Sequence, residues 1–207
     1  MNHTPYPVVL DACVLYPSFL RDLLIRLGLT GLYQPKWSAS IENEWQRNLL
    51  ANRTVLTEDQ IKRTATLMNK AIPDALVTGF EPLIDSIDLP DVDDRHVAAA
   101  AVRSNAEIIV TLNLKDFPAP ALDAFGIEVL HPDDFVMDLF DLNRALVLSA
   151  VTTQRSSWGL GSNGTVNAVK RSFKVANNKS TTYSIPSGKR IDGHSWTGAK
   201  QIDCMLR

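Results

Sequence analysis

Apolar residues in the first 150 positions follow two spacings, one typical of buried strands and one typical of helices. Short apolar runs predict strands at 8–10, in "LYQPKW", at 108–111 and in "GIEVLH". Apolar residues three and four apart predict helices from Ser18, from about Ser38, from the Thr57–Gln60 capping box to Pro73, and over 93–104, 119–125 and 132–149. Residues 77–90 carry neither pattern. Strands that alternate with helices predict an α/β fold with a central parallel sheet.

Polar side chains stand directly after two of the predicted strands. Asp11 follows the first strand and leads into an expected loop, and Asn113 and Asp116 lie in the polar turn after the strand at 108–111. Ligands of parallel α/β sheets gather at the carboxyl ends of the strands. We therefore expect these side chains to meet at one edge of the sheet.

The stretch "LPDVDDRHVAAAA" concentrates three aspartates before a run of small apolar residues. Asp91 at the expected helix start and Asp94 three residues later form a capping-box-like pattern. Carboxylates in a first helical turn are each worth about 0.3–1 kcal/mol through the helix dipole. Helix capping is therefore one interpretation. The other is that Asp94, supported by Asp91, binds a divalent cation while Asp93 stays solvated.

Each acidic residue has an ordinary structural interpretation when taken alone. A lone aspartate after a strand usually caps or turns the chain, and Glu42 and Glu44 on a predicted helix would ordinarily face solvent. Their combination with an acidic helix start and an acidic exit from a late strand favours a shared site. Mg²⁺ and Mn²⁺ are hard cations that prefer such oxygen ligands.

Several neighbours of these carboxylates have two interpretations. Thr111 either positions a ligand through its hydroxyl or is a buried strand threonine. Arg95 either contacts a phosphate or pairs with a nearby aspartate. We expect His96 to pack or to face solvent, and Trp37 and Trp45 to belong to the core.

Four motifs resemble the PIN-domain family, which includes the VapC-like toxins of bacteria: "VVLDACVLYPS", "WSASIENEW", "PDVDDRHVAAAAV" and "IIVTLNLKDFP". The likeness covers about residues 5–140, and it implies a three-layer fold with a central parallel sheet flanked by helices. The family's first aspartate falls on Asp11. Its helix glutamate falls on Glu44, with Glu42 as the less favoured register, and its third acidic residue falls on Asp94.

The fourth acidic position of the family departs from the usual pattern in this chain. Many members carry an aspartate two residues after the threonine of "VT", where this chain has Asn113. Asp116 follows three residues later, so that either residue could serve. The resemblance thus implies the catalytic set Asp11, Glu44, Asp94 and Asp116, with Asn113 as an additional metal ligand.

The resemblance implies a metal-dependent endoribonuclease that uses Mg²⁺ or Mn²⁺ to hydrolyse phosphodiester bonds in RNA. Unpaired bases in single strands and loops are what such a site can best reach. It also implies a toxin of a toxin–antitoxin pair, with a small antitoxin as its partner and a homodimer as an assembly.

Two other classes of protein are alternatives to this nuclease. A haloacid-dehalogenase-like phosphatase would need a second aspartate two positions after Asp11, where this chain has Cys13. This class is therefore much less favoured than the nuclease. A PIN-like module that binds RNA or protein without cutting is compatible with Asn113. The retention of Asp11, Glu44 and Asp94 favours catalysis.

Composition predicts the cellular compartment of the protein and a boundary between two segments of the chain. The 207 residues, 45% of them hydrophobic, can bury one good core. The two cysteines have neither metal-binding nor disulfide-framework spacing, which fits a reducing cytoplasm, and no apolar run is long enough to predict a membrane span. Residues 1–150 hold 12 Lys and Arg against 21 Asp and Glu, whereas residues 151–207 hold 9 against 2. We therefore expect a PIN-like nuclease domain over 1–150 and a separate basic segment over 151–207.

The basic segment over 151–207 is rich in Ser, Thr, Gly and Asn and lacks an amphipathic period, which predicts a poorly ordered tail. Three explanations are open: a basic arm that contacts phosphates, a segment that folds on a partner, and sequence from an altered reading frame. The last, or a disordered tail, is favoured because nothing in the segment resembles the helical continuation usual in the family.

Removal of residues 159–207 should therefore leave both the melting temperature and RNA cleavage nearly unchanged. Thermal unfolding and a cleavage assay on the full and shortened chains measure this. A large loss of RNA affinity in the shortened chain would instead support the basic arm.

Overall fold

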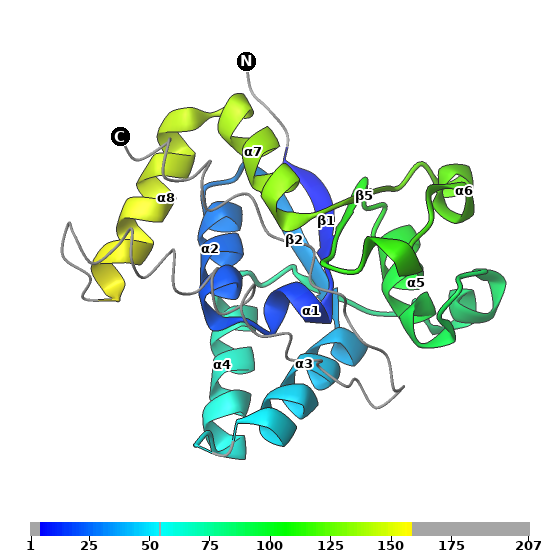
Figure 1. The fold of residues 1–207 in the computed structure, drawn as a ribbon, viewed down its shortest axis with the longest axis horizontal. Helices are drawn as coiled ribbons and strands as arrows, with labels where there is room; N and C mark the ends of the chain where they lie inside the picture. Colours follow the sequence, from blue (N-terminus) through cyan, green and yellow to red (C-terminus); the bar gives the residue numbers. More distant parts are fainter. Residues whose placement is uncertain (1–4, 54, 159–207) are drawn as a thin grey trace. The chain divides into compact units, whose positions relative to one another are not determined.

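The computed structural model describes residues 5–53 and 55–158, and five of its strands form one parallel sheet (Figure 1). The strand order is β3-β2-β1-β4-β5, and every neighbouring pair is parallel. The strands are β1 (Tyr6–Leu10), β2 (Tyr33–Ser38), β3 (Leu76–Val77), β4 (Ile108–Val110) and β5 (Glu128–Leu130). The predicted α/β fold with a central parallel sheet is confirmed.

Helices connect the strands and cover the sheet. The α-helices are α1 (Ala12–Leu15), α2 (Ser18–Leu29), α3 (Ala39–Asn52), α4 (Glu58–Ala71), α5 (Arg95–Arg103), α6 (Ala119–Leu122), α7 (Pro132–Leu142) and α8 (Arg144–Ser157). Short 3-10 helices lie between them: η1 (Glu81–Ser86), η2 (Val92–Asp94), η3 (Leu114–Asp116) and η4 (Asp123–Phe125).

The sheet is buried between helices on its two faces. On one face, the hydroxyl of Tyr33 in β2 donates to the Leu24 carbonyl of α2 at 2.8 Å, and its ring packs edge-on against Phe135 of α7. Helix α5 contacts β1, β2 and β4, and Figure 1 shows α2 and α5 on opposite sides of the strands. The small apolar run of the sequence is explained by this position, because the alanines 98–101 of α5 are all fully buried.

The chain changes direction across the sheet between β1 and β4. From β1 it adds β2 and β3 on one side, and it then returns to add β4 and β5 on the other. In open parallel sheets the carboxyl end of the strands at such a reversal is where ligands bind. Here Leu10 pairs with Val110, and the Asp11 amide donates to the Val110 carbonyl at 3.1 Å. The residues that follow these two strands therefore lie together.

Two expectations about local structure are corrected, and a stretch for which no structure was predicted is assigned. The loop expected after Asp11 is instead helix α1, whose first amide, that of Ala12, donates to the Asp11 carboxylate. The single helix expected over 132–149 is two helices, because the chain breaks at Asn143, whose side-chain oxygen accepts from the Leu146 amide at 3.1 Å. The patternless residues 77–90 contain the end of β3 and helix η1.

The chain divides into two units, Met1–Val147 and Leu148–Arg207. The first unit holds the whole sheet. Helix α8 continues to Ser157, so residues 151–157 are helical where a poorly ordered tail was expected. The rest of that expected tail, from residue 159, lies outside the described residues, and the boundary at 150/151 stays a prediction. Among the described residues, no helix has both the length and the apolar character that crossing a membrane requires.

Gly28 of α2 lies directly against Pro35 of β2. A Cβ at position 28 would lie 2.8 Å from Cδ of the proline ring, closer than carbon atoms pack. Such overpacking costs about 1–3 kcal/mol, which outweighs the roughly 1 kcal/mol that alanine gains over glycine inside a helix. Gly28→Ala should therefore lower the free energy of unfolding by up to about 2 kcal/mol in urea titrations.

The double variant Gly28→Ala with Pro35→Ala is the control. It should be less destabilised than the two single changes together predict, because the ring that causes the overlap is gone. A stabilising Gly28→Ala would show that α2 does not pack this closely on β2.

Candidate metal centre

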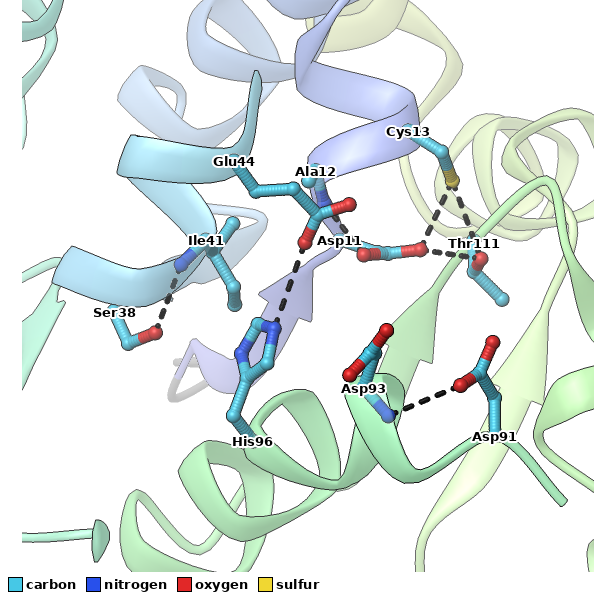
Figure 2. Close-up of polar contacts among 10 residues, drawn as sticks. All are labelled: Asp11, Ala12, Cys13, Ser38, Ile41, Glu44, Asp91, Asp93, His96 and Thr111. Carbon is cyan, nitrogen blue, oxygen red and sulfur yellow. Dashed lines mark hydrogen bonds and ion pairs between the residues drawn. The ribbon is translucent and has the colours of Figure 1, made fainter. Parts of the chain in front are cut away.

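Asp11 lies at the carboxyl end of β1 and is 5% exposed. One oxygen, Oδ2, accepts from the Thr111 hydroxyl at 2.7 Å and from the Cys13 thiol at 3.0 Å, and Oδ1 accepts from the Ala12 amide at 2.6 Å (Figure 2). Burial raises the pKa of Asp11 and the nearby Glu44 raises it further, while these three donors act in the opposite direction. The carboxylate is thus fixed in place and electrostatically strained.

Glu44 reaches this end of the sheet from α3. Ser38 caps that helix by accepting from the Ile41 amide at 3.2 Å (Figure 2). Ile41 and Trp45 of the same helix are fully buried. The Glu44 carboxylate lies 3.5 Å from Nε2 of His96 in α5, with both side chains mostly buried. His96 therefore has a polar partner that the sequence did not indicate.

The alternative glutamate, Glu42, belongs to a different set of contacts. The Asn69 side-chain amide of α4 donates to the Glu42 carboxylate at 2.9 Å and accepts from the Trp37 indole at 3.0 Å. Glu44, and not Glu42, contributes to the raised pKa of both Asp11 and Asp94. Of the two glutamates, Glu44 is therefore the one that lies near Asp11 and Asp94. Trp37 and Trp45 are fully buried, as expected.

The three aspartates before α5 differ in their environments. Asp91 accepts from the Asp93 amide at 3.0 Å and so caps η2 (Figure 2), while Asp93 is exposed, as expected. Asp94 makes no capping hydrogen bond, so the predicted capping-box-like pair is wrong. Within the described part of the chain, Oδ2 of Asp94 is buried without a hydrogen-bond partner. Capping therefore explains Asp91 and leaves Asp94 unexplained.

Burial and the charges of four other carboxylates raise the pKa of Asp94. Burial is the largest cause that raises its pKa to about 8, followed by the charges of Asp11, Asp91, Asp116 and Glu44. The carboxylate oxygens of Asp91, Asp94 and Asp116 approach within 4.8 Å of one another. Asp91, Asp94 and Asp116 therefore form a cluster at the reversal of the sheet, and Asp11 and Glu44 lie near enough to act on Asp94 through their charges.

The exit from β4 places Asp116 in this group. Helix η3 turns the chain back after Asn113, whose side-chain amide donates to Oδ2 of Asp116. The Asn113 backbone amide in turn donates to the Thr111 hydroxyl at 3.0 Å. Thr111 is fully buried, so it is both a core residue and a hydrogen-bond donor to Asp11. Arg95 lies 3.4 Å from the exposed Asp88, in agreement with the ion-pair interpretation.

The residues present fit a divalent cation. All the candidate ligands are hard oxygen donors, the preferred ligands of Mg²⁺ and Mn²⁺. Asp91, Asp94 and Asp116 are close enough together to share one ion, with Asp11 and Glu44 beside them. A cation would also give the buried Oδ2 of Asp94 a partner and reduce the repulsion among the carboxylates.

Asp94→Asn should stabilise the metal-free protein. In EDTA the melting temperature should rise by about 2–4 °C, the effect of about 1 kcal/mol on a chain of this size. The folded pKa of about 8 exceeds the ordinary 3.8, so the unfolded chain releases this proton at lower pH than the folded chain. Wild-type stability therefore falls as the pH rises from 4 to 8, and the advantage of the variant should grow over the same range.

Asp93→Asn is the matched control for this measurement. It removes the same charge from the same helix start, but Asp93 is exposed and does not contribute to the raised pKa of Asp94. Its melting temperature should stay close to that of the wild type. A lower melting temperature for Asp94→Asn in EDTA would contradict the strained carboxylate cluster.

The C-terminal helices match a known family of domains. A family model described as "VapC50 C-terminal domain" matches residues 132–159, which include α7 and α8. This match extends past residue 151. It therefore corrects the expectation that nothing from that point resembles a helical continuation of the family.

The larger part of the chain matches a second family. A protein of Mycobacterium tuberculosis (strain ATCC 25618 / H37Rv), "Putative ribonuclease VapC50", is 47% identical over 81 residues, which are 37% of this chain and 47% of that protein. The match thus spans about half the length of this curated relative. No solved structure matches the chain. A family model described as "PIN domain" matches residues 7–115, more than half of the chain, and the chain therefore belongs to the PIN domain family.

Proposed function

We propose that this protein is a metal-dependent endoribonuclease that hydrolyses phosphodiester bonds in RNA, and that it is the toxin of a toxin–antitoxin pair. The observation that carries the proposal is the environment of Asp94. Its buried Oδ2 has no hydrogen-bond partner among the described residues, and four other carboxylates converge on it. Helix capping does not account for this arrangement, whereas a bound cation does.

The proposed catalytic carboxylates are Asp11, Glu44, Asp94 and Asp116. Asp116 takes the fourth acidic position, and Asn113 orients it through the side-chain amide that donates to it. An amide oxygen in place of that nitrogen would face the carboxylate oxygen and repel it, so Asn113 acts on Asp116 as a donor. The side-chain oxygen of Asn113 then supplies at most one further ligand to the cation.

Other side chains support this set. Asp91 lies within ligand-sharing distance of Asp94 and Asp116. Thr111 holds Asp11 by donating to Oδ2. Arg95 pairs with Asp88, which is fully exposed, so an RNA phosphate can compete for its guanidinium group.

The carboxylates alone would repel an RNA phosphate. A bound Mg²⁺ or Mn²⁺ ion supplies a lowered pKa for an attacking water and stabilises charge on the leaving oxygen. The chain's own part is to hold the ligands: burial and hydrogen bonds fix Asp11, and the start of α5 presents Asp94. Because these groups stand on rigid elements, little reorganisation is needed when RNA binds.

The RNA substrate and the antitoxin partner rest on similarity. The curated relative is named as a ribonuclease, and the motifs resemble VapC-like toxins. Mg²⁺ or Mn²⁺ as the ion, location in the cytoplasm and a homodimer stay predictions.

RNA cleavage by the full-length protein with Mg²⁺ or Mn²⁺, compared with EDTA, tests the proposal. Cleavage should require the metal, and Asp11→Asn, Glu44→Gln and Asp94→Asn should each lower the rate by about 100-fold or more, because loss of a ligand should cost at least as much as loss of its supporting partner. Gel analysis of single-stranded and hairpin RNAs measures both effects. Circular dichroism should show that the variants are folded.

Asp93→Asn is again the matched control and should cleave at the wild-type rate. Equal cleavage by the wild type and by Asp94→Asn would exclude this cluster as the active site. Persistent absence of cleavage, together with normal RNA affinity and no metal binding, would favour the module that binds without cutting.

A further inference from the structure

Two parallel hydrogen-bond chains end on the same oxygen of Asp11. In one, the Asn113 amide donates to the Thr111 hydroxyl at 3.0 Å, and this hydroxyl donates to Oδ2 of Asp11 at 2.7 Å. In the other, the Leu112 amide donates to the Cys13 sulfur at 3.1 Å. The thiol in turn donates to the same Oδ2 at 3.0 Å (Figure 2). Successive amides of the β4 exit thus reach one carboxylate through a hydroxyl and a thiol.

The thiol bridges two segments that carry different carboxylates. Cys13 stands in α1, two residues after Asp11, and Leu112 immediately precedes Asn113, which donates to Asp116. By accepting from one segment and donating to the other, the sulfur fixes the β4 exit relative to Asp11. The thiol also lies 3.3 Å from the Thr111 hydroxyl, so the two chains are in contact.

We propose that Cys13 is a positioning residue of the metal centre, which holds Asp11 in register with the exit loop of Asp116 through its paired hydrogen bonds. The proposal rests on the proposed function for the identity of the centre. Sulfur itself is not assigned as a ligand, because Mg²⁺ and Mn²⁺ prefer oxygen ligands and the thiol already bonds to Asp11 and Leu112. From the sequence, Cys13 was interpreted only through its spacing from the second cysteine and as a departure from the phosphatase pattern.

Simple packing is the competing explanation, and it makes different predictions. If the sulfur only filled space, its loss would lower stability and leave metal affinity unchanged. If its hydrogen bonds position Asp11, alanine should weaken metal binding, whereas serine, whose hydroxyl both donates and accepts, should restore it. Partners that orient metal ligands typically contribute 10–100-fold to metal affinity.

The test is Mn²⁺ binding to the full-length protein by calorimetry, for the wild type, Cys13→Ala and Cys13→Ser. Cys13→Ala should raise the Mn²⁺ dissociation constant by about 10-fold or more, and Cys13→Ser should stay within about 3-fold of the wild type. RNA cleavage should follow the same order at low Mn²⁺. The deficit of Cys13→Ala should shrink when Mn²⁺ is raised, because the lost interaction acts on metal binding.

Val14→Ala is the matched control for packing. Val14 is the next residue of α1 and is fully buried, so this change removes apolar volume without touching the hydrogen-bond chains. It should lower the melting temperature more than Cys13→Ala does and leave the Mn²⁺ dissociation constant unchanged. Val14→Ala should thus have the larger effect on the melting temperature, and Cys13→Ala the larger effect on the Mn²⁺ dissociation constant. A packing role for Cys13 cannot produce this difference.

Three results would overturn the proposal. Wild-type Mn²⁺ affinity in Cys13→Ala would show that the thiol does not position the centre, and equal losses in the serine and alanine variants would show that hydrogen bonding is not what matters. No Mn²⁺ binding by the wild type would remove both this proposal and the metal centre. If the wild type binds Mn²⁺ but cuts no RNA, only the nuclease proposal fails, and the dissociation constants still decide the role of Cys13.

Discussion

Mutual repulsion among carboxylates is the constraint that the rest of the structure must satisfy. Burial and the charges of Asp11, Asp91, Asp116 and Glu44 raise the pKa of Asp94 to about 8, so the fold holds charges together at a cost to its own stability. The opposing free energy comes from the apolar parts of the same elements: β1 is buried from Val8 to Leu10, and the alanines of α5 are fully buried. Strain of this kind, concentrated at one site and compensated elsewhere, is what a functional centre produces.

Topology explains why the repulsion is concentrated at one place. Strands β1 and β4 are far apart in the sequence but adjacent in the sheet, so Asp11 and Thr111 emerge side by side. Hydrogen bonds from Thr111 and Cys13 then stabilise the charged form of Asp11 without adding a positive charge. This leaves the cluster negative, and concentrated negative charge attracts a divalent ion more strongly than a monovalent one.

The sheet and most helices could be predicted from the sequence because their signals are local. Apolar runs gave β1 and β4, and the Thr57–Gln60 pair forms the capping box that begins α4. The break between α7 and α8 at Asn143 was missed because the apolar helix pattern continues on both sides of it. The hydrogen bond that Asn143 accepts from the Leu146 amide leaves no mark in that pattern. The capping role of Asp94 was predicted wrongly because the turn of η2 precedes α5 and because its surroundings come from distant segments. Polar contacts across the sheet, such as those of Cys13 and His96, have no periodic signal in the sequence.

The asparagine at position 113 changes the electrostatics of the cluster more than its geometry. An aspartate there would add a negative charge next to Asp116, in a group that already raises the pKa of Asp94. The amide instead donates to Asp116, which lowers the repulsion and orients that carboxylate. With one charge fewer, the cluster attracts a cation less strongly, but Asp91, Asp94 and Asp116 still lie close enough to hold one ion. In the proposed metal centre, this departure is therefore better suited to one firmly held cation than to two.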